Sequence, residues 1–93
     1  MIRFEAGSGR FDRHAEVYRF TAADDEGRVP CAISREGLEW LSRSKADASD
    51  PMQLFNDWEK VVFDLARDKY NRGERQSGGA IVIRSGDGPG GRQ

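Results

Sequence analysis

Reactive side chains of the kinds that catalysis most often uses are scarce in this sequence, which has one histidine and one cysteine. His14 could act as a general base with Asp12 nearby, but its charged surroundings before a predicted strand favour a solvated loop residue. Cys31 could be a nucleophile in a redox role, yet it shares strand parity with Val29 and Ile33. That parity predicts a buried and inert thiol on an apolar face.

The residues that could bind metals or phosphate groups do not have the spacing that such sites need. One cysteine and one histidine cannot supply a zinc or iron site. Asp24, Asp25 and Glu26 lack the alternating ligands of a calcium loop, so they indicate a solvated turn. The glycine-rich segments 7–9 and 86–91 do not join a strand to a helix, which a phosphate loop requires. We therefore predict no catalytic residue, no cofactor and no metal, and hence no enzyme.

A base-stacking surface on a small sheet is the strongest chemical alternative. It would combine two aromatic residues with four arginines, Tyr18, Phe20, Arg10, Arg13, Arg19 and Arg28. Against it, 15 basic residues are balanced by 16 acidic ones, and so short a chain needs its aromatic residues in the core. Nucleic-acid binding is therefore the second hypothesis, and we expect no appreciable binding at physiological salt.

Apolar and polar residues alternate in the segments that we predict to be strands. The predicted strands are 2–5, 16–21, 29–33 and 81–83. A turn over 24–27 would join the second and third into a hairpin spanning residues 16–33. Because Pro30 has no amide hydrogen, the third strand is expected at an edge of the sheet.

Two helices are predicted between the third and fourth strands. Ser34 resembles the N-cap of a short helix that ends near Ser42. A long helix is predicted from Pro51 to Arg72, with Asp50 as its N-cap and Gly73 closing it. Its apolar residues recur at helical spacing, which makes it the clearest signal in the chain.

The order β-β-β-α-α-β predicts an α+β fold with a small antiparallel sheet and both helices packed on one face. Ninety-three residues favour one domain, here residues 1–84, and the glycine-rich segment 85–93 is expected to be a disordered tail. No apolar run is long enough for a membrane helix. A single cysteine gives no disulfide framework, so the cytoplasm is the expected compartment.

These residues resemble a bacterial family named domain of unknown function 1488. The similarity lies in the segment 29–34 with Glu36 and Leu38, then in Phe55, Val62, Ala66, Lys69 and Tyr70, and in 81–83. It covers most of the chain from about Val17 to Arg84. Membership implies a compact α+β domain and brings no activity, ligand or catalytic residue.

The long helix offers the closest approach to a function. Met52, Phe63 and Tyr70 form a strip beside its main apolar face, and the face and the strip together make an apolar arc wider than one sheet usually covers. Trp40 of the short helix could cover it, or a partner protein or a second copy could do so. The main apolar face itself is expected to pack on the sheet with Trp58 near its centre. We therefore predict an interaction patch of Met52, Phe63, Tyr70 and Trp40 on a non-enzymatic accessory protein that acts through its surface or as a homodimer.

Overall fold

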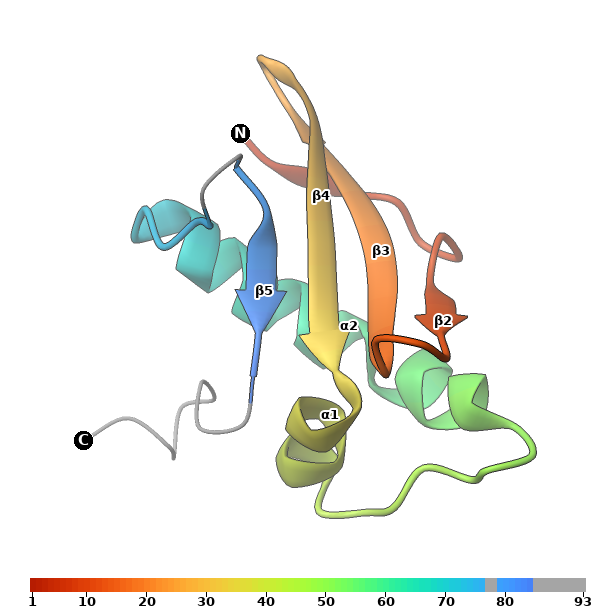
Figure 1. The fold of residues 1–93 in the computed structure, drawn as a ribbon. Helices are drawn as coiled ribbons and strands as arrows, with labels where there is room; N and C mark the ends of the chain where they lie inside the picture. Colours follow the sequence, from red (N-terminus) through yellow and green to blue (C-terminus); the bar gives the residue numbers. More distant parts are fainter. Residues whose placement is uncertain (77–78, 85–93) are drawn as a thin grey trace.

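Figure 1 shows the computed structural model, which describes residues 1–76 and 79–84. The elements in these residues are β1 (Arg3–Phe4), β2 (Arg10–Asp12), β3 (Val17–Asp24), β4 (Gly27–Ser34), α1 (Arg35–Ser42), α2 (Pro51–Asn71) and β5 (Ile81–Ile83). The predicted α+β fold is confirmed, with one more strand than expected before the helices. The tail predicted at 85–93 lies outside the described residues.

A long antiparallel hairpin organises the sheet. β3 pairs with β4 along its whole length, from Val17 opposite Ser34 to Asp24 opposite Gly27. The Asp24 carboxylate accepts a hydrogen bond from the backbone N–H of Glu26 at 2.9 Å, which stabilises the turn. Gly27 has a φ of 129°, a region that glycine reaches without steric cost. The hairpin predicted from the sequence is therefore confirmed.

The remaining strands lie on either side of this hairpin. β1 and β2 both pair antiparallel with β3, so together they form an interrupted edge strand. β5 pairs with β4 in parallel on the other side. The sequence analysis missed β2 because Phe11 is its one apolar residue, and three residues are too few for an alternating pattern.

Two expectations about the sheet were wrong. The sheet contains one parallel pair, because α1 and α2 carry the chain back before β5 begins. β4 is an interior strand between β3 and β5, although Pro30 predicted an edge position. The pairing with β5 begins at Cys31, so Pro30 lies just before the stretch where an amide hydrogen would be required.

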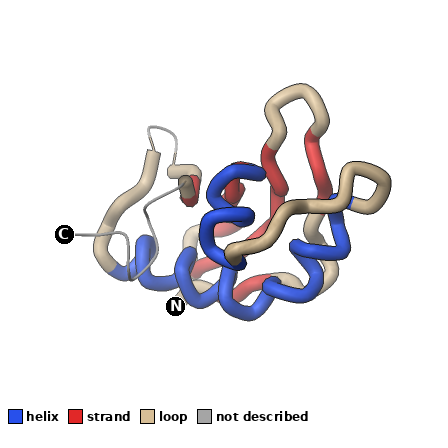
Figure 2. Tube along the Cα trace, turned by 90° about the horizontal axis from the view of Figure 1, so that it is seen from below, coloured by secondary structure: helices blue, strands red, loops and turns tan. Residues whose placement is uncertain are grey.

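Helix α2 lies along one face of the sheet (Figure 2). Its buried positions are Phe55, Val62, Leu65, Ala66 and Lys69, and they meet the inward side chains of β3, β4 and β5. Trp58, expected near the centre of this contact, is only half-buried at its margin. None of the helices within residues 1–76 and 79–84 is long and apolar enough to cross a membrane.

Both helices begin at the predicted residues, and only α1 has a side-chain cap at its start. The Ser34 side chain caps α1 by accepting a hydrogen bond from the backbone N–H of Gly37 at 2.9 Å. Asp50 occupies the N-cap position of α2, as predicted, but its side chain makes no capping hydrogen bond. Gly73 takes a φ of 75° just after α2, as expected for a residue that ends a helix.

The ring of Phe55 joins α2 to β3. It is fully buried, with its centroid 5.5 Å from that of Tyr18 and 5.7 Å from that of Phe20. Gly9, in the loop before β2, lies against the edge of the same ring, and a Cβ there would come 2.5 Å from Phe55 Cε1. The loop can therefore pass this ring only where the chain carries no side chain.

We expect Gly9→Ala to lower the free energy of unfolding by about 1–3 kcal/mol, because the buried ring cannot move aside. Urea denaturation of the variant would measure this loss. The control is the double variant Gly9→Ala/Phe55→Leu, in which the smaller side chain relieves the clash. Its destabilisation should be less than the sum of the two single effects, and full additivity would contradict the contact.

Candidate functional site

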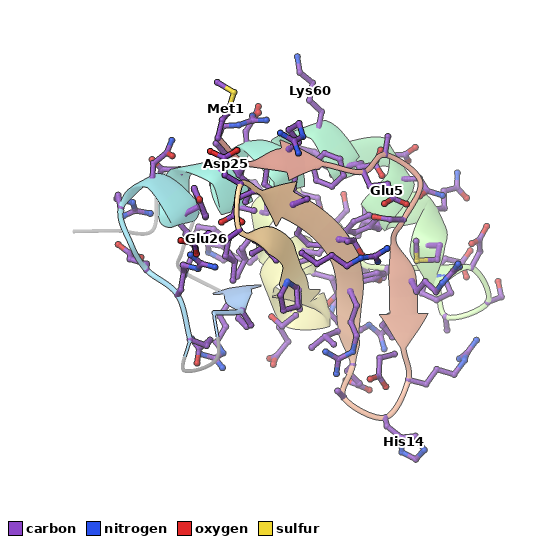
Figure 3. The ribbon with its side chains drawn as sticks, turned by 90° about the horizontal axis from the view of Figure 1, so that it is seen from above. Met1, Glu5, His14, Asp25, Glu26 and Lys60 are labelled. Atoms are coloured by element: carbon purple, nitrogen blue, oxygen red, sulfur yellow. The ribbon has the colours of Figure 1, made fainter. Side chains whose placement is uncertain are left out.

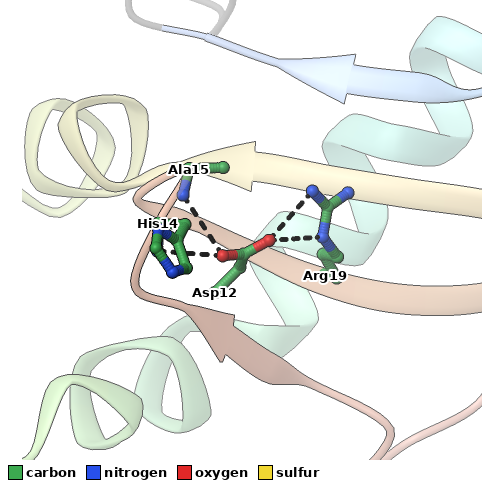
Figure 4. Close-up of polar contacts among 4 residues, drawn as sticks. All are labelled: Asp12, His14, Ala15 and Arg19. Carbon is green, nitrogen blue, oxygen red and sulfur yellow. Dashed lines mark hydrogen bonds and ion pairs between the residues drawn. The ribbon is translucent and has the colours of Figure 1, made fainter.

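The imidazole of His14 and the carboxylate of Asp12, the acid–base alternative considered above, are not joined by a hydrogen bond. Asp12 Oδ1 accepts hydrogen bonds from the backbone N–H groups of His14 at 3.0 Å and Ala15 at 3.2 Å (Figure 4). Its Oδ2 accepts from Arg19 Nε at 3.2 Å and Nη2 at 3.1 Å. The bonds from Ala15 and Arg19 hold the pKa of the Asp12 carboxyl below its usual value. Figure 3 shows the His14 ring pointing away from the fold. The Asp12 carboxylate therefore stabilises the turn between β2 and β3 and does not orient the His14 ring.

Cys31 is buried on the inner face of β4, as its strand parity predicted. Cys31 is 4% exposed, and its Sγ lies 3.5 Å from the carbonyl oxygen of Val29. Burial raises the pKa of this thiol to about 12. The thiolate, which is the reactive form, is therefore scarce at neutral pH.

Two acidic side chains of the hairpin turn, Asp24 and Asp25, contact other groups of the protein. Asp24 is 8% exposed, and its Oδ2 accepts a hydrogen bond from the Tyr70 hydroxyl at 2.9 Å. Asp25 lies 3.5 Å from the N-terminal amine of Met1, and both point outward beside Glu26 in Figure 3. Among residues 1–76 and 79–84, no three histidine, cysteine or acidic side chains are grouped so as to hold a metal ion.

The strip predicted beside the main face of α2 is partly covered by the chain itself. Phe63 stacks on Phe4 of β1 with ring centroids 4.9 Å apart, so the cover comes from β1 and not from α1. Tyr70 is bound to the hairpin turn through its hydroxyl, and Met52 is half-buried against the core. Trp40 remains 39% exposed on α1. As an interaction patch, these four residues stay a prediction.

The aromatic residues and the arginines of the predicted base-stacking surface lie on opposite faces of the sheet. Tyr18 and Phe20 are buried under α2, at 0% and 3% exposure. The other face carries three of the four arginines, Arg10, Arg19 and Arg28. The fourth, Arg13, lies in the turn between β2 and β3. The sheet therefore offers no exposed aromatic platform at Tyr18 and Phe20.

The face opposite α2 carries its arginines in two pairs, and we call it the arginine face. At one end, Arg3 of β1 and Arg28 of β4 both lie beside Ala23 of β3. At the other end, Arg10 of β2 lies directly opposite Arg19 of β3. Arg19 and Ala23 share a parity on β3, so all four arginines stand on the same side of the sheet.

Three of the four side chains on the arginine face form no ion pair within the described residues. Arg19 forms an ion pair with Asp12 at 3.1 Å. Arg3, Arg10 and Arg28 are exposed, and none of them forms an ion pair with any other described residue. In Figure 1, α2 passes behind the strands, and this face is turned to the viewer with no helix across it. Three guanidinium groups are therefore free to meet an external anion.

Two shallow hollows lie on the arginine face and share Thr21 as a common wall. The first is lined by Arg3, Glu5 and Arg28. The second is lined by Arg10 and Arg19, together with residues of the 7–9 loop and of β4. Each hollow thus places two arginines beside the same small-residue centre.

Three of these arginines, Arg10, Arg19 and Arg28, could be expected from the sequence in one basic surface, but their arrangement could not. The sequence does not give the register between the strands, which separates them from Tyr18 and Phe20. Arg3 lies in a two-residue strand whose partner the sequence does not reveal. The alternation of side chains along a strand could have shown the separation, because Arg19 lies between Tyr18 and Phe20 and must face away from them.

We expect the Cys31 thiol of the native protein to react with DTNB at least a hundredfold more slowly than the thiol of the protein in denaturant. Burial and the raised pKa both limit thiolate formation in the folded state. Absorbance at pH 8, with and without urea, would measure the two rates. Equal rates in both conditions would show an accessible thiol and restore a redox role for Cys31.

Comparisons with known proteins place the chain in a family and establish its fold. A family model described as "Protein of unknown function (DUF1488)" matches residues 2–83. A crystal structure of a DUF1488 protein from Shewanella loihica PV-4 is similar, with a TM-score of 0.78 and 21% identity over 90% of this chain and 92% of that one. No curated protein matches the chain. Since the family model covers most of its residues, the chain belongs to the DUF1488 family.

Proposed function

We propose that this protein is a non-enzymatic interaction protein of the cytoplasm that docks an acidic partner protein on its arginine face. The observation that carries the proposal is the set of three exposed arginines, Arg3, Arg10 and Arg28, that have no ion-pair partner in the described residues. Arginine is well suited to this role, because its planar fork binds carboxylates with two parallel hydrogen bonds.

The non-enzymatic character is supported by the state of the reactive groups. Asp12 is committed to four hydrogen bonds within its turn, and Cys31 is buried with a raised pKa. Catalytic groups need access to a substrate and a pKa matched to their task, and neither residue meets both conditions. A binding role makes no such demand on them.

A protein partner is favoured over nucleic acid by the composition of the arginine face. Its centre consists of small residues, Thr21, Ala23 and Pro30, and the aromatic residues that adjoin the two hollows, Phe4 and Phe20, occupy strand positions that face α2 and so present no ring for bases to stack on. An apolar centre rimmed by arginine is common in protein–protein interfaces. The net charge of −1 also gives no long-range attraction to a phosphate backbone.

We expect the immobilised chain to capture a specific acidic protein from an extract of cells that produce it naturally. Reversing the face charge in Arg3→Glu/Arg28→Glu should abolish capture, because both guanidinium groups of one hollow are then lost. Lys60→Glu/Arg43→Glu is the matched control, since it makes the same charge change at exposed positions on α2 and just after the end of α1. In Figure 3, Lys60 points outward from α2, away from the sheet.

Mass spectrometry of the captured material, with and without nuclease, distinguishes the outcomes. The proposal predicts a protein that is retained by the native chain and by the control, is lost from the face variant, and survives nuclease. Retention of the same proteins by all three forms would contradict docking on this face. Material that nuclease releases would establish nucleic-acid binding in its place.

A further inference from the structure

We infer that the arginine face binds an extended acidic segment of its partner, with two carboxylates four residues apart and a small apolar residue midway between them. This inference rests on the proposed function and specifies the ligand of the same site. It follows from the spacing of the two arginine pairs, from the residues between them, and from the acidic side chain in the first hollow.

The strand register fixes the distance between the two pairs. Arg3 and Arg28 flank Ala23, whereas Arg10 lies beside Arg19, four residues earlier on β3. At about 3.3 Å of rise per residue, the two rows are about 13 Å apart along β3. A ligand that engages both hollows must therefore present two anionic groups at about this separation.

An extended chain lying along β3 matches this distance. Its side chains alternate, so those at one position and four positions further on point to the same side and are about 13 Å apart. In a helix, side chains on one face recur about every 5.4 Å, and none of the first three multiples of this step falls at 13 Å. The spacing therefore selects an extended segment.

Each arginine pair can hold one carboxylate. Neighbouring strands are about 4.8 Å apart, so Arg3 and Arg28 lie on either side of a group placed above Ala23. Arg19 uses Nε and Nη2 to bind Asp12, which fixes its guanidinium plane beside the free side chain of Arg10. The first pair thus encloses its carboxylate from two sides, and the second presents one oriented and one mobile guanidinium.

The residues between the pairs limit what can lie there. Thr21 forms part of both hollows and is paired with Pro30, and Glu5 lies beside it, since the backbone N–H of Glu5 donates to the carbonyl oxygen of Thr21 at 3.1 Å. The midpoint of the face is therefore shallow and has an acidic side chain at its edge. The middle inward-facing residue of the ligand lies over this point. A small apolar side chain fits there, because a third acidic one would be repelled by Glu5.

Glu5 favours a carboxylate over a phosphate in the first hollow. It lines this hollow together with Arg3 and Arg28, so an incoming anion meets two positive charges and one negative charge. Repulsion from Glu5 acts more strongly on a doubly charged phosphate than on a singly charged carboxylate. The same side chain therefore disfavours phosphorylated ligands.

Synthetic seven-residue peptides test this inference directly. The matching peptide has glutamates at its second and sixth positions, valine at the fourth and serine elsewhere. One control exchanges the valine and the second glutamate, so that the two glutamates are two residues apart instead of four. Another control replaces both glutamates with glutamine. Fluorescence anisotropy of labelled peptides in about 150 mM salt would give the dissociation constants. A short RNA duplex of similar charge serves as the nucleic-acid probe.

We expect the matching peptide to bind about tenfold more tightly than either control, and the RNA duplex to bind more weakly still. Arg10→Gln/Arg28→Gln should remove this preference, whereas Lys60→Gln should keep it. Urea midpoints of these variants would verify that they fold. Equal affinity for both glutamate spacings would overturn the extended-ligand inference but leave the proposed function intact. Tighter binding of the RNA would overturn both.

Discussion

The packing of the Phe55 ring against Tyr18 and Phe20 is the contact on which the rest of the structure depends. It joins α2 to β3, and it draws the aromatic side chains of the sheet to one face. Phe63 and Phe4 extend the same cluster to β1, which is how a two-residue strand comes to be held at the edge. Because strand side chains alternate, the opposite face is left with the polar partners of these residues. The arginine face is thus a consequence of how the core is built.

This division of the sheet explains how a chain with balanced charge can have a basic surface. The sequence has 15 basic and 16 acidic residues, so its overall charge gives no indication of a binding site. Many acids are used locally: Asp64 pairs with Arg67 and Asp68 with Arg72 on α2. Arg3, Arg10 and Arg28 have no such neighbours in the described part of the chain. Unpaired positive charge is thus concentrated on one face of the sheet, although the net charge of the whole chain remains near zero.

The sequence predicted the elements well and their assembly poorly. The hairpin, both helices, the burial of Cys31 and the family resemblance could be recognised because each depends on local alternation, capping or spacing. The parallel pairing of β5, the interior position of β4 and the short strand β2 depend on contacts between distant residues. The site was missed for the same reason, since Arg3 and Arg28 are brought together only through their common neighbour Ala23.

The central claim is that Arg3, Arg10 and Arg28 form a surface that receives carboxylates. Its most direct test is an NMR titration of the native protein with acetate that follows the Nε–Hε signals of the arginine side chains. The account predicts the largest shifts at these three arginines, and small shifts at Arg67 and Arg72, which already have acidic partners. Shifts of equal size at all arginines would contradict it, because the arginine face would then be no different from any other exposed surface.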